Sequence, residues 1–158
     1  IVRLDGTPRQ IDLPETRRGL SRYYRIGPAQ LANDDPSFSA AQLSFEGLGL
    51  RPLSPVHLCL NGLHGADRTL SWTRRSRIDA DTWEGQDVPL GEETEQYIVR
   101  ILKGNNLVRE DTTTTPSWTY TAAAQSIDQI TGGFDIAVAQ VSARFGAGRF
   151  ATLQVLAL

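Results

Sequence analysis

Short segments in which apolar and polar residues alternate, separated by turn-forming residues, constrain this chain most strongly. Helical periodicity is nearly absent, and the best helical candidate, residues 122–130, is short and polar. After residue 53, alternation recurs at 56–60, 70–73, 97–102, 118–120, 134–139 and 152–155. With residues 107–110, this makes seven short strands in about 105 residues. Such spacing is typical of an immunoglobulin-like β-sandwich, so we expect an all-β fold.

Turns and core positions follow from the same pattern. Gly and Asn residues suited to tight hairpin turns occur in Lys103-Gly104-Asn105-Asn106 and in Phe145-Gly146-Ala147-Gly148. Trp72 and Trp118 fall at inward positions of their predicted strands, so we expect both side chains in the core.

The first third of the chain has few large apolar residues and is not expected to close a core alone. A hairpin is expected over Ile1–Leu13, with Asp5-Gly6 as its turn, and further strands are expected at 22–26 and 41–45. These features predict the C-terminal part of a preceding β domain.

Two prolines, Pro52 and Pro55, bracket a shift in composition. We therefore expect residues 1–53 to be the end of the preceding β domain plus a linker, and residues 54–158 to be the sandwich. The chain begins at Ile1 and contains no methionine, which suggests a piece of a longer protein.

Charge and composition exclude several classes of function. Sixteen basic and eighteen acidic residues give a net charge of −2, whereas nucleic-acid binding needs a surplus of Lys and Arg. The longest apolar runs fall short of the 18 residues that a membrane-spanning helix requires. A single cysteine, Cys59, excludes a disulfide within the chain. We expect neither a nucleic-acid partner nor a membrane span.

Soft metal ligands are too few for a complete site. His57, Cys59 and His64 are the available ones, and a structural zinc site needs four ligands. The interpretation that fits better is a surface histidine, a small apolar thiol and a loop histidine, so no metal or cofactor is expected.

Acidic clusters give no catalytic arrangement either. The acids at 79, 81, 84 and 87 could supply oxygen ligands to calcium, but they lack the glycine of a calcium-binding loop. Glu92, Glu93 and Glu95 lie together at the entrance of a strand, where solvated acids are expected rather than a glycosidase pair facing across a cleft. Nucleophile, phosphate and dinucleotide motifs are missing, so the chain is not expected to be an enzyme.

The insert Ser76–Glu93 is longer than a sandwich hairpin needs, and long loops on a rigid scaffold often carry binding groups. One aromatic residue stands among alternating charges there, which is typical of an interface anchor with a polar rim. The predicted interface residues are Arg77, Asp79, Asp81, Trp83, Glu84 and Asp87. Two alternatives remain: the insert covers a sheet edge of its own domain, or Trp83 packs inward.

From Ser54 onward the chain resembles a fibronectin type III module. The features that carry the resemblance are Ser54-Pro55-Val56, Leu70-Ser71-Trp72, Tyr97-x-Val99-x-Ile101, Phe134-x-Ile136-x-Val138 and Gly146-x-Gly148. The insert departs from the family pattern. Phe134 also departs from it. The family has a tyrosine at this position, in the motif called the tyrosine corner, and the resemblance implies that the hydrogen bond of that tyrosine's hydroxyl is missing here.

The chain also resembles the C-terminal region of large tail-tip hub proteins of siphophages and gene transfer agents. The matching segments are Tyr23-Tyr24-Arg25-Ile26-Gly27-Pro28-Ala29, Gly49-Leu50-Arg51-Pro52-Leu53-Ser54-Pro55, Trp72-Thr73-Arg74-Arg75-Ser76-Arg77, Asp81-x-Trp83, Val88-Pro89-Leu90-Gly91-Glu92-Glu93 and Tyr97. The family's upstream barrel domain has no counterpart in these residues.

The tail-hub resemblance implies a structural baseplate protein of the virion tail tip, assembled in the host cytoplasm. It implies a homotrimer in the tail, other tail and baseplate proteins as partners, and a host cell-surface receptor as a further partner. The alternative function is a carbohydrate-binding accessory module of a secreted enzyme, for which a planar row of exposed aromatic residues would be the signature.

Overall fold

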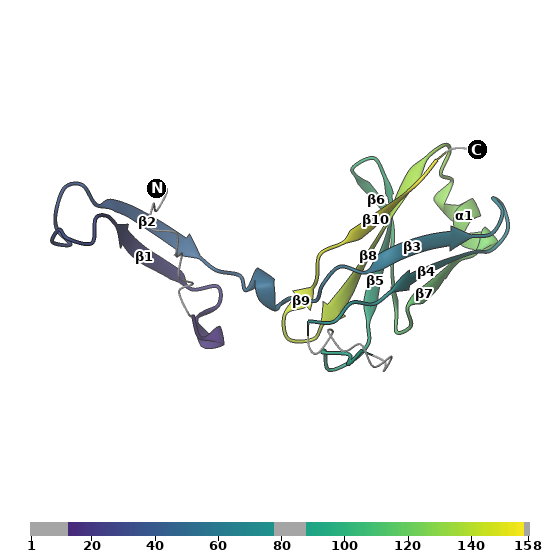
Figure 1. Ribbon diagram of the computed structural model, residues 1–158. Coiled ribbons are helices and arrows are strands. Elements are labelled where there is room, and N and C mark those ends of the chain that lie inside the picture. The colour runs from purple at the N-terminus through teal and green to yellow at the C-terminus, as the bar shows by residue number, and fades with distance from the viewer. Residues whose placement is uncertain (1–12, 78–87, 157–158) are drawn as a thin grey trace. The chain divides into compact units, whose positions relative to one another are not determined.

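The computed structural model describes residues 13–77 and 88–156 (Figure 1). The chain divides into two units, Ile1–Gly49 and Leu50–Leu158, and each is described by itself. Apart from Leu13, the predicted hairpin over Ile1–Leu13 lies outside the described residues. No helix in the described ranges is both long enough and apolar enough to cross a membrane.

The first unit contains one antiparallel hairpin. A 3-10 turn, η1 (Glu15–Arg17), precedes β1 (Ser21–Ile26), which pairs with β2 (Ser39–Ser44) along its whole length. A second turn, η2 (Leu48–Leu50), leads out of the unit. None of residues 13–49 is fully buried, and Tyr23 is 81% exposed. A two-stranded sheet without buried side chains is marginal by itself in water.

The second unit is an antiparallel β-sandwich of the fibronectin type III and immunoglobulin-like kind (Figure 1), which confirms the predicted all-β fold. One sheet has the order β3-β4-β7, and the other has the order β10-β8-β5-β6, with the short β9 beside β8. The strands are β3 (Val56–Asn61), β4 (Arg68–Thr73), β5 (Tyr97–Lys103), β6 (Asn106–Thr113), β7 (Ser117–Tyr120), β8 (Phe134–Ser142), β9 (Gly146–Ala147) and β10 (Ala151–Val155).

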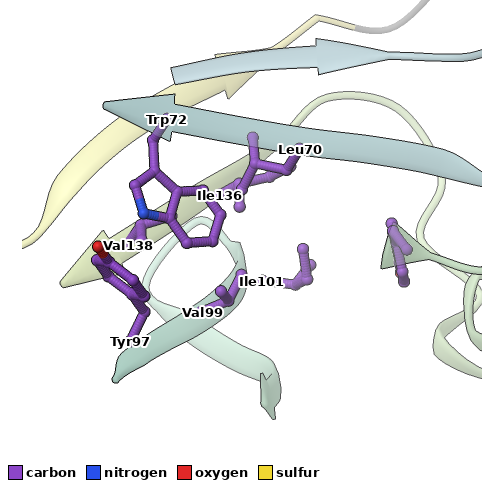
Figure 2. Close-up of a cluster of buried hydrophobic side chains, with 8 residues drawn as sticks. Leu70, Trp72, Tyr97, Val99, Ile101, Ile136 and Val138 are labelled. Carbon is purple, nitrogen blue, oxygen red and sulfur yellow. The ribbon is translucent and has the colours of Figure 1, made fainter. Parts of the chain in front are cut away.

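The core lies between the two sheets (Figure 2). Side chains of alternating residues meet there because successive strand residues point to opposite faces. The buried cluster contains Leu70, Trp72, Tyr97, Val99, Ile101, Tyr120, Ile136 and Val138. Trp72 is 6% exposed and meets the Tyr97 ring edge-on at 5.1 Å, as predicted for a core residue. Trp118 is only half-buried, and it packs against the cluster by stacking on Tyr120 at 5.3 Å.

The turn between β5 and β6 is confirmed. Lys103 pairs with Asn106, so Gly104 and Asn105 form a two-residue loop. Gly104 has φ +60°, and a positive φ at the first central position is the requirement of a type II′ turn. The turn sets the first pairs of the hairpin, and the register then shifts at an irregularity between Leu102 and Ile101.

The other predicted turn, Phe145 to Gly148, is wrong. Ser142 of β8 pairs with Gly146 of β9, so the chain reverses over residues 143–145. Gly148 serves close packing instead, because a Cβ atom there would come within 2.3 Å of the Pro52 carbonyl oxygen. Its N–H donates to the Gln140 carbonyl at 2.8 Å.

One short helix, α1 (Ala122–Asp128), follows β7, close to the predicted span of 122–130. The Thr121 side chain accepts a hydrogen bond from the Ala124 N–H at 3.1 Å and so caps the first turn. Gln129 ends the helix in the left-handed conformation with φ 47°. Capping residues thus fix both ends of α1.

Candidate functional site

The insert joins β4 to β5, and the structure describes its two ends. Of the six predicted interface residues, Arg77 lies within the described part. The other five, Asp79, Asp81, Trp83, Glu84 and Asp87, lie outside the described residues, so their role stays a prediction. The site can be built from the base of the insert, which comprises residues 74–77 and 88–95.

Arg77 ties the two ends of the insert together. Its Nη2 atom donates to Oε1 of Glu92 at 2.8 Å, and the Glu92 side chain is only 5% exposed. The Arg77 guanidinium also lies 6.0 Å from the centre of the Phe145 ring, within the range of a cation–π contact. A partly desolvated arginine–carboxylate pair of this kind is stronger than an exposed one.

Arg74, three residues before Arg77, makes a second clamp. Its Nη1 atom donates to the Pro89 carbonyl at 2.9 Å, and its Nη2 atom donates to the Val88 carbonyl at 2.6 Å. The Nε atom of Arg74 lies 4.0 Å from Glu95. The forked guanidinium can hold two backbone carbonyls at once because its donors are coplanar.

Glu95 connects this clamp to the core. Its Oε1 atom accepts a 2.7 Å hydrogen bond from the Tyr97 hydroxyl, whose ring packs against Trp72. Burial raises the pKa of the Tyr97 hydroxyl above its ordinary value, and the Glu95 carboxylate raises it further. The hydroxyl therefore remains a proton donor, and the end of the insert is anchored to the sandwich.

The expectation that Glu92, Glu93 and Glu95 are all solvated is wrong for two of them. Glu93 is exposed, but Glu92 is nearly buried and Glu95 is partly buried, because both accept hydrogen bonds at the base of the insert. The sequence carried a signal for this arrangement. Two arginines three residues apart flank the start of the insert, and two glutamates three residues apart flank its end.

The three soft ligands do not form one site. His57 and Cys59 are both exposed on β3, and the strand bulges between Val56 and Cys59, where His57 adopts φ 55°. The Cys59 Sγ atom lies 3.8 Å from Oδ1 of Asn61. Across the described ranges, no three His, Cys, Asp or Glu side chains gather as ligands of one ion.

A second polar network, which the sequence interpretation missed, joins β6, β7 and α1. Arg109 donates to both carboxylate oxygens of Asp128 at 2.8 Å, and the Tyr120 hydroxyl donates to Oδ2 of Asp128 at 2.7 Å. Phe134, at the position of the family's corner tyrosine, packs edge-on against Tyr120 at 6.2 Å. Phe134 itself has no hydroxyl to donate, but the hydroxyl of the neighbouring Tyr120 makes a hydrogen bond beside it.

Comparison with known proteins finds similarity only among solved structures. No family model matches the chain, and no curated protein matches it. Among solved structures, domains d3–d4 of the rat CD45 extracellular region align with 98% of this chain and 72% of theirs, at 10% identity and a TM-score of 0.49.

Single modules align with the sandwich part. The FN3tt variant covers 66% of this chain and 94% of its own, at 13% identity and a TM-score of 0.44. The FN5 domain of Drosophila Lar covers 67% and 96%, at 15% identity and a TM-score of 0.38. Because these identities and TM-scores are low, we assign the fold from the strand order of the chain itself.

Proposed function

We propose that this chain is a structural module of a siphophage or gene transfer agent tail tip, where it mediates assembly with other tail and baseplate proteins or contact with the host surface. The proposal combines the sequence resemblance to tail-tip hub proteins with a β-sandwich fold. The resemblance further suggests a homotrimer within the virion tail. The role is one of binding and assembly, without catalysis and without a cofactor.

The observation that carries the proposal is the double arginine clamp at the base of the insert. Arg74 and Arg77 reach across 14 and 15 residues to the far end of the insert. A loop needed only as a connection does not require both ends to be fixed by charged groups, whereas a recognition loop benefits from ends that are preorganised. The clamps therefore favour the interface role over simple edge cover.

The carbohydrate-binding alternative is not favoured by the aromatic residues of the sandwich. Trp72 lies in the core, and Trp118 stacks on Tyr120. The large apolar side chains exposed on the described part of the sandwich unit are aliphatic: Leu50, Leu63, Leu107, Val108, Ile127 and Leu156. A sugar platform is typically a planar aromatic surface, so these side chains do not suit one.

The test replaces residues 79–86 with eight Gly and Ser residues in the 158-residue chain. Both clamps keep their partners in this variant, because residues 74, 77, 88, 89 and 92 are retained. We expect an unchanged melting temperature, together with loss of incorporation into tail particles seen by electron microscopy.

Arg74→Gln is the matched control, since it loosens a clamp but leaves all six predicted interface residues unchanged. It should lower the melting temperature slightly and reduce incorporation less than the Gly/Ser variant does. Normal incorporation of a well-folded Gly/Ser variant would contradict the interface role.

A further inference from the structure

The β3–β4 loop, α1 and the C-terminal end of β10 come together at one end of the sandwich (Figure 1). Residues of these three segments line a hollow. It has two lobes, of about 250 Å³ and 390 Å³, which share His64, Ile130, Thr131 and Phe134 as lining residues. We name it the end hollow. Its volume falls in the range of sites for small organic molecules.

The charge of the end hollow is positive. Among the described lining residues, the ionisable ones are His64, Arg68 and Tyr120, and none is an Asp or Glu. Lys103 lies next to the lining residue Gly132, where a Cβ atom would be 3.5 Å from the Lys103 Nζ atom. An anion entering the hollow would meet cationic side chains and no acidic side chain among the described lining residues.

Two acids that are adjacent in sequence to lining residues, Asp67 and Asp128, already accept hydrogen bonds. Asp67, which precedes Arg68, accepts a hydrogen bond from the Ala122 N–H at 2.8 Å. Asp128 accepts three hydrogen bonds, two from Arg109 and one from the Tyr120 hydroxyl. Neither acid forms an ion pair with Arg68 in the described structure.

Arg68 itself has an unmet hydrogen-bonding need. Its Nε atom is shielded from water and has no partner among the described residues. By contrast, Arg77, Arg100 and Arg109 each bond a carboxylate at 2.8 Å or less. A shielded donor on a permanently charged group is costly unless an acceptor reaches it. A carboxylate in the hollow would pair with the guanidinium of Arg68 through its terminal nitrogens, which are not among the shielded unpaired atoms.

We propose that the end hollow binds small organic carboxylates that carry an apolar body. The carboxylate pairs with Arg68, and a ring N–H of His64 is a second donor at the mouth between the lobes. The apolar body contacts Ile130, Phe134 and Val155. This site is separate from the insert, whose clamp residue Arg77 lies near Phe145 before β9, so it does not depend on the proposed assembly role.

The probe is phenylacetate, titrated into the ¹⁵N-labelled 158-residue chain and followed by NMR. The Nε–H group of Arg68 belongs to the guanidinium that pairs with the carboxylate, so its signal reports on binding. We expect saturable shifts of this signal and of residues 130–134, with at least tenfold weaker binding of phenylacetamide, which lacks the charge, and of acetate, which lacks the body. Non-saturating shifts, or equal binding of the amide, would overturn the proposal.

Variants test the assignment to Arg68. Arg68→Gln should weaken phenylacetate binding at least tenfold, whereas Arg100→Gln, which removes the same charge elsewhere on the sandwich, should not change it. Leu156 is 73% exposed and lines the larger lobe, so Leu156→Asp should weaken binding without unfolding the chain, and Leu156→Asn should not. If Arg68→Gln does not fold, the comparison of Leu156→Asp with Leu156→Asn still tests the proposal. Equal phenylacetate affinity of these two variants would contradict an anion site.

Discussion

The Tyr120 hydroxyl, at the end of β7, donates a 2.7 Å hydrogen bond to Oδ2 of Asp128, at the end of α1. Arg109 of β6 approaches the same carboxylate with two donors, and the Asp128 side chain is only 5% exposed. One carboxylate thus joins a strand from each sheet to the helix that connects β7 and β8.

Removal of this carboxylate should destabilise the sandwich strongly. Asp128→Ala leaves the Arg109 guanidinium and the Tyr120 hydroxyl without their acceptor, so we expect a loss of about 1.5 to 3 kcal/mol, the range for hydrogen bonds to charged groups. Urea denaturation of the 158-residue chain measures it. Asp111→Asn is the matched control, because Asp111 lies 3.8 Å from Arg109 and is more exposed; its loss should stay below about 1 kcal/mol. Equal losses for the two variants would contradict this role.

The same carboxylate should make stability fall in acid. Hydrogen bonds from Arg109 lower the pKa of Asp128, even though burial opposes the shift, and the Tyr120 hydroxyl lowers it further. Because the folded pKa lies below the unfolded value of about 3.9, the stabilisation is present above that pH and is lost as the pH falls through the folded pKa. Asp128→Asn should therefore show a shallower decline in unfolding free energy between about pH 5 and pH 2 than the unmodified chain. Parallel declines would show that other acids control the acid response.

Trp72 should be the main anchor of the core. Its ring is buried between the sheets against Tyr97 (Figure 2), so Trp72→Ala should cost about 3 to 5 kcal/mol, the range for truncating a large aromatic residue in a core. Leu63→Ala, at a side chain that is 79% exposed, should change stability by less than about 0.5 kcal/mol. Denaturant titration compares the two. A loss below about 1 kcal/mol for Trp72→Ala would be incompatible with an anchoring role.

His57 should be a site where glycine stabilises the chain. Its φ of 55° at the β3 bulge lies in the left-handed region, which costs a residue with a Cβ atom roughly 1 to 2 kcal/mol. His57→Gly should raise the unfolding free energy by about 1 kcal/mol, less than the full strain because glycine also loosens the unfolded chain. His57→Ala keeps the strain and is the matched control. If the glycine variant is no more stable than the alanine variant, the strain is not the governing factor.

Residues 1–49 should not fold cooperatively when expressed alone. The hairpin β1–β2 has no fully buried side chain within residues 13–49, whereas residues 50–156 contain the core cluster. Calorimetry of the isolated segment should show no sharp heat-absorption peak, while residues 50–158 should show one. A cooperative transition in residues 1–49 would contradict this prediction.

The sequence was sufficient for the strands because alternation is a local property. Val99 and Ile101 alternate with Arg100, so one face of β5 is apolar whatever its neighbours are, and Gly104 with Asn105 fixes the following turn. The inward position of Trp72 follows from the same alternation. The fold class and most of the core could therefore be predicted from residues close together in the chain.

Tertiary structure alone decided the pairings between distant residues. Arg74 and Arg77 meet carbonyls and a carboxylate at the far end of the insert, and Asp128 accepts hydrogen bonds from donors of β6 and β7. Gly148 passes Pro52 rather than forming a turn, and Arg68 lines the end hollow with an Nε atom that has no partner among the described residues. Each of these contacts depends on the register of the strands and on the stacking of two sheets. A pattern with a period of two residues predicts which face a side chain occupies, but it carries no information about which distant group that side chain will meet.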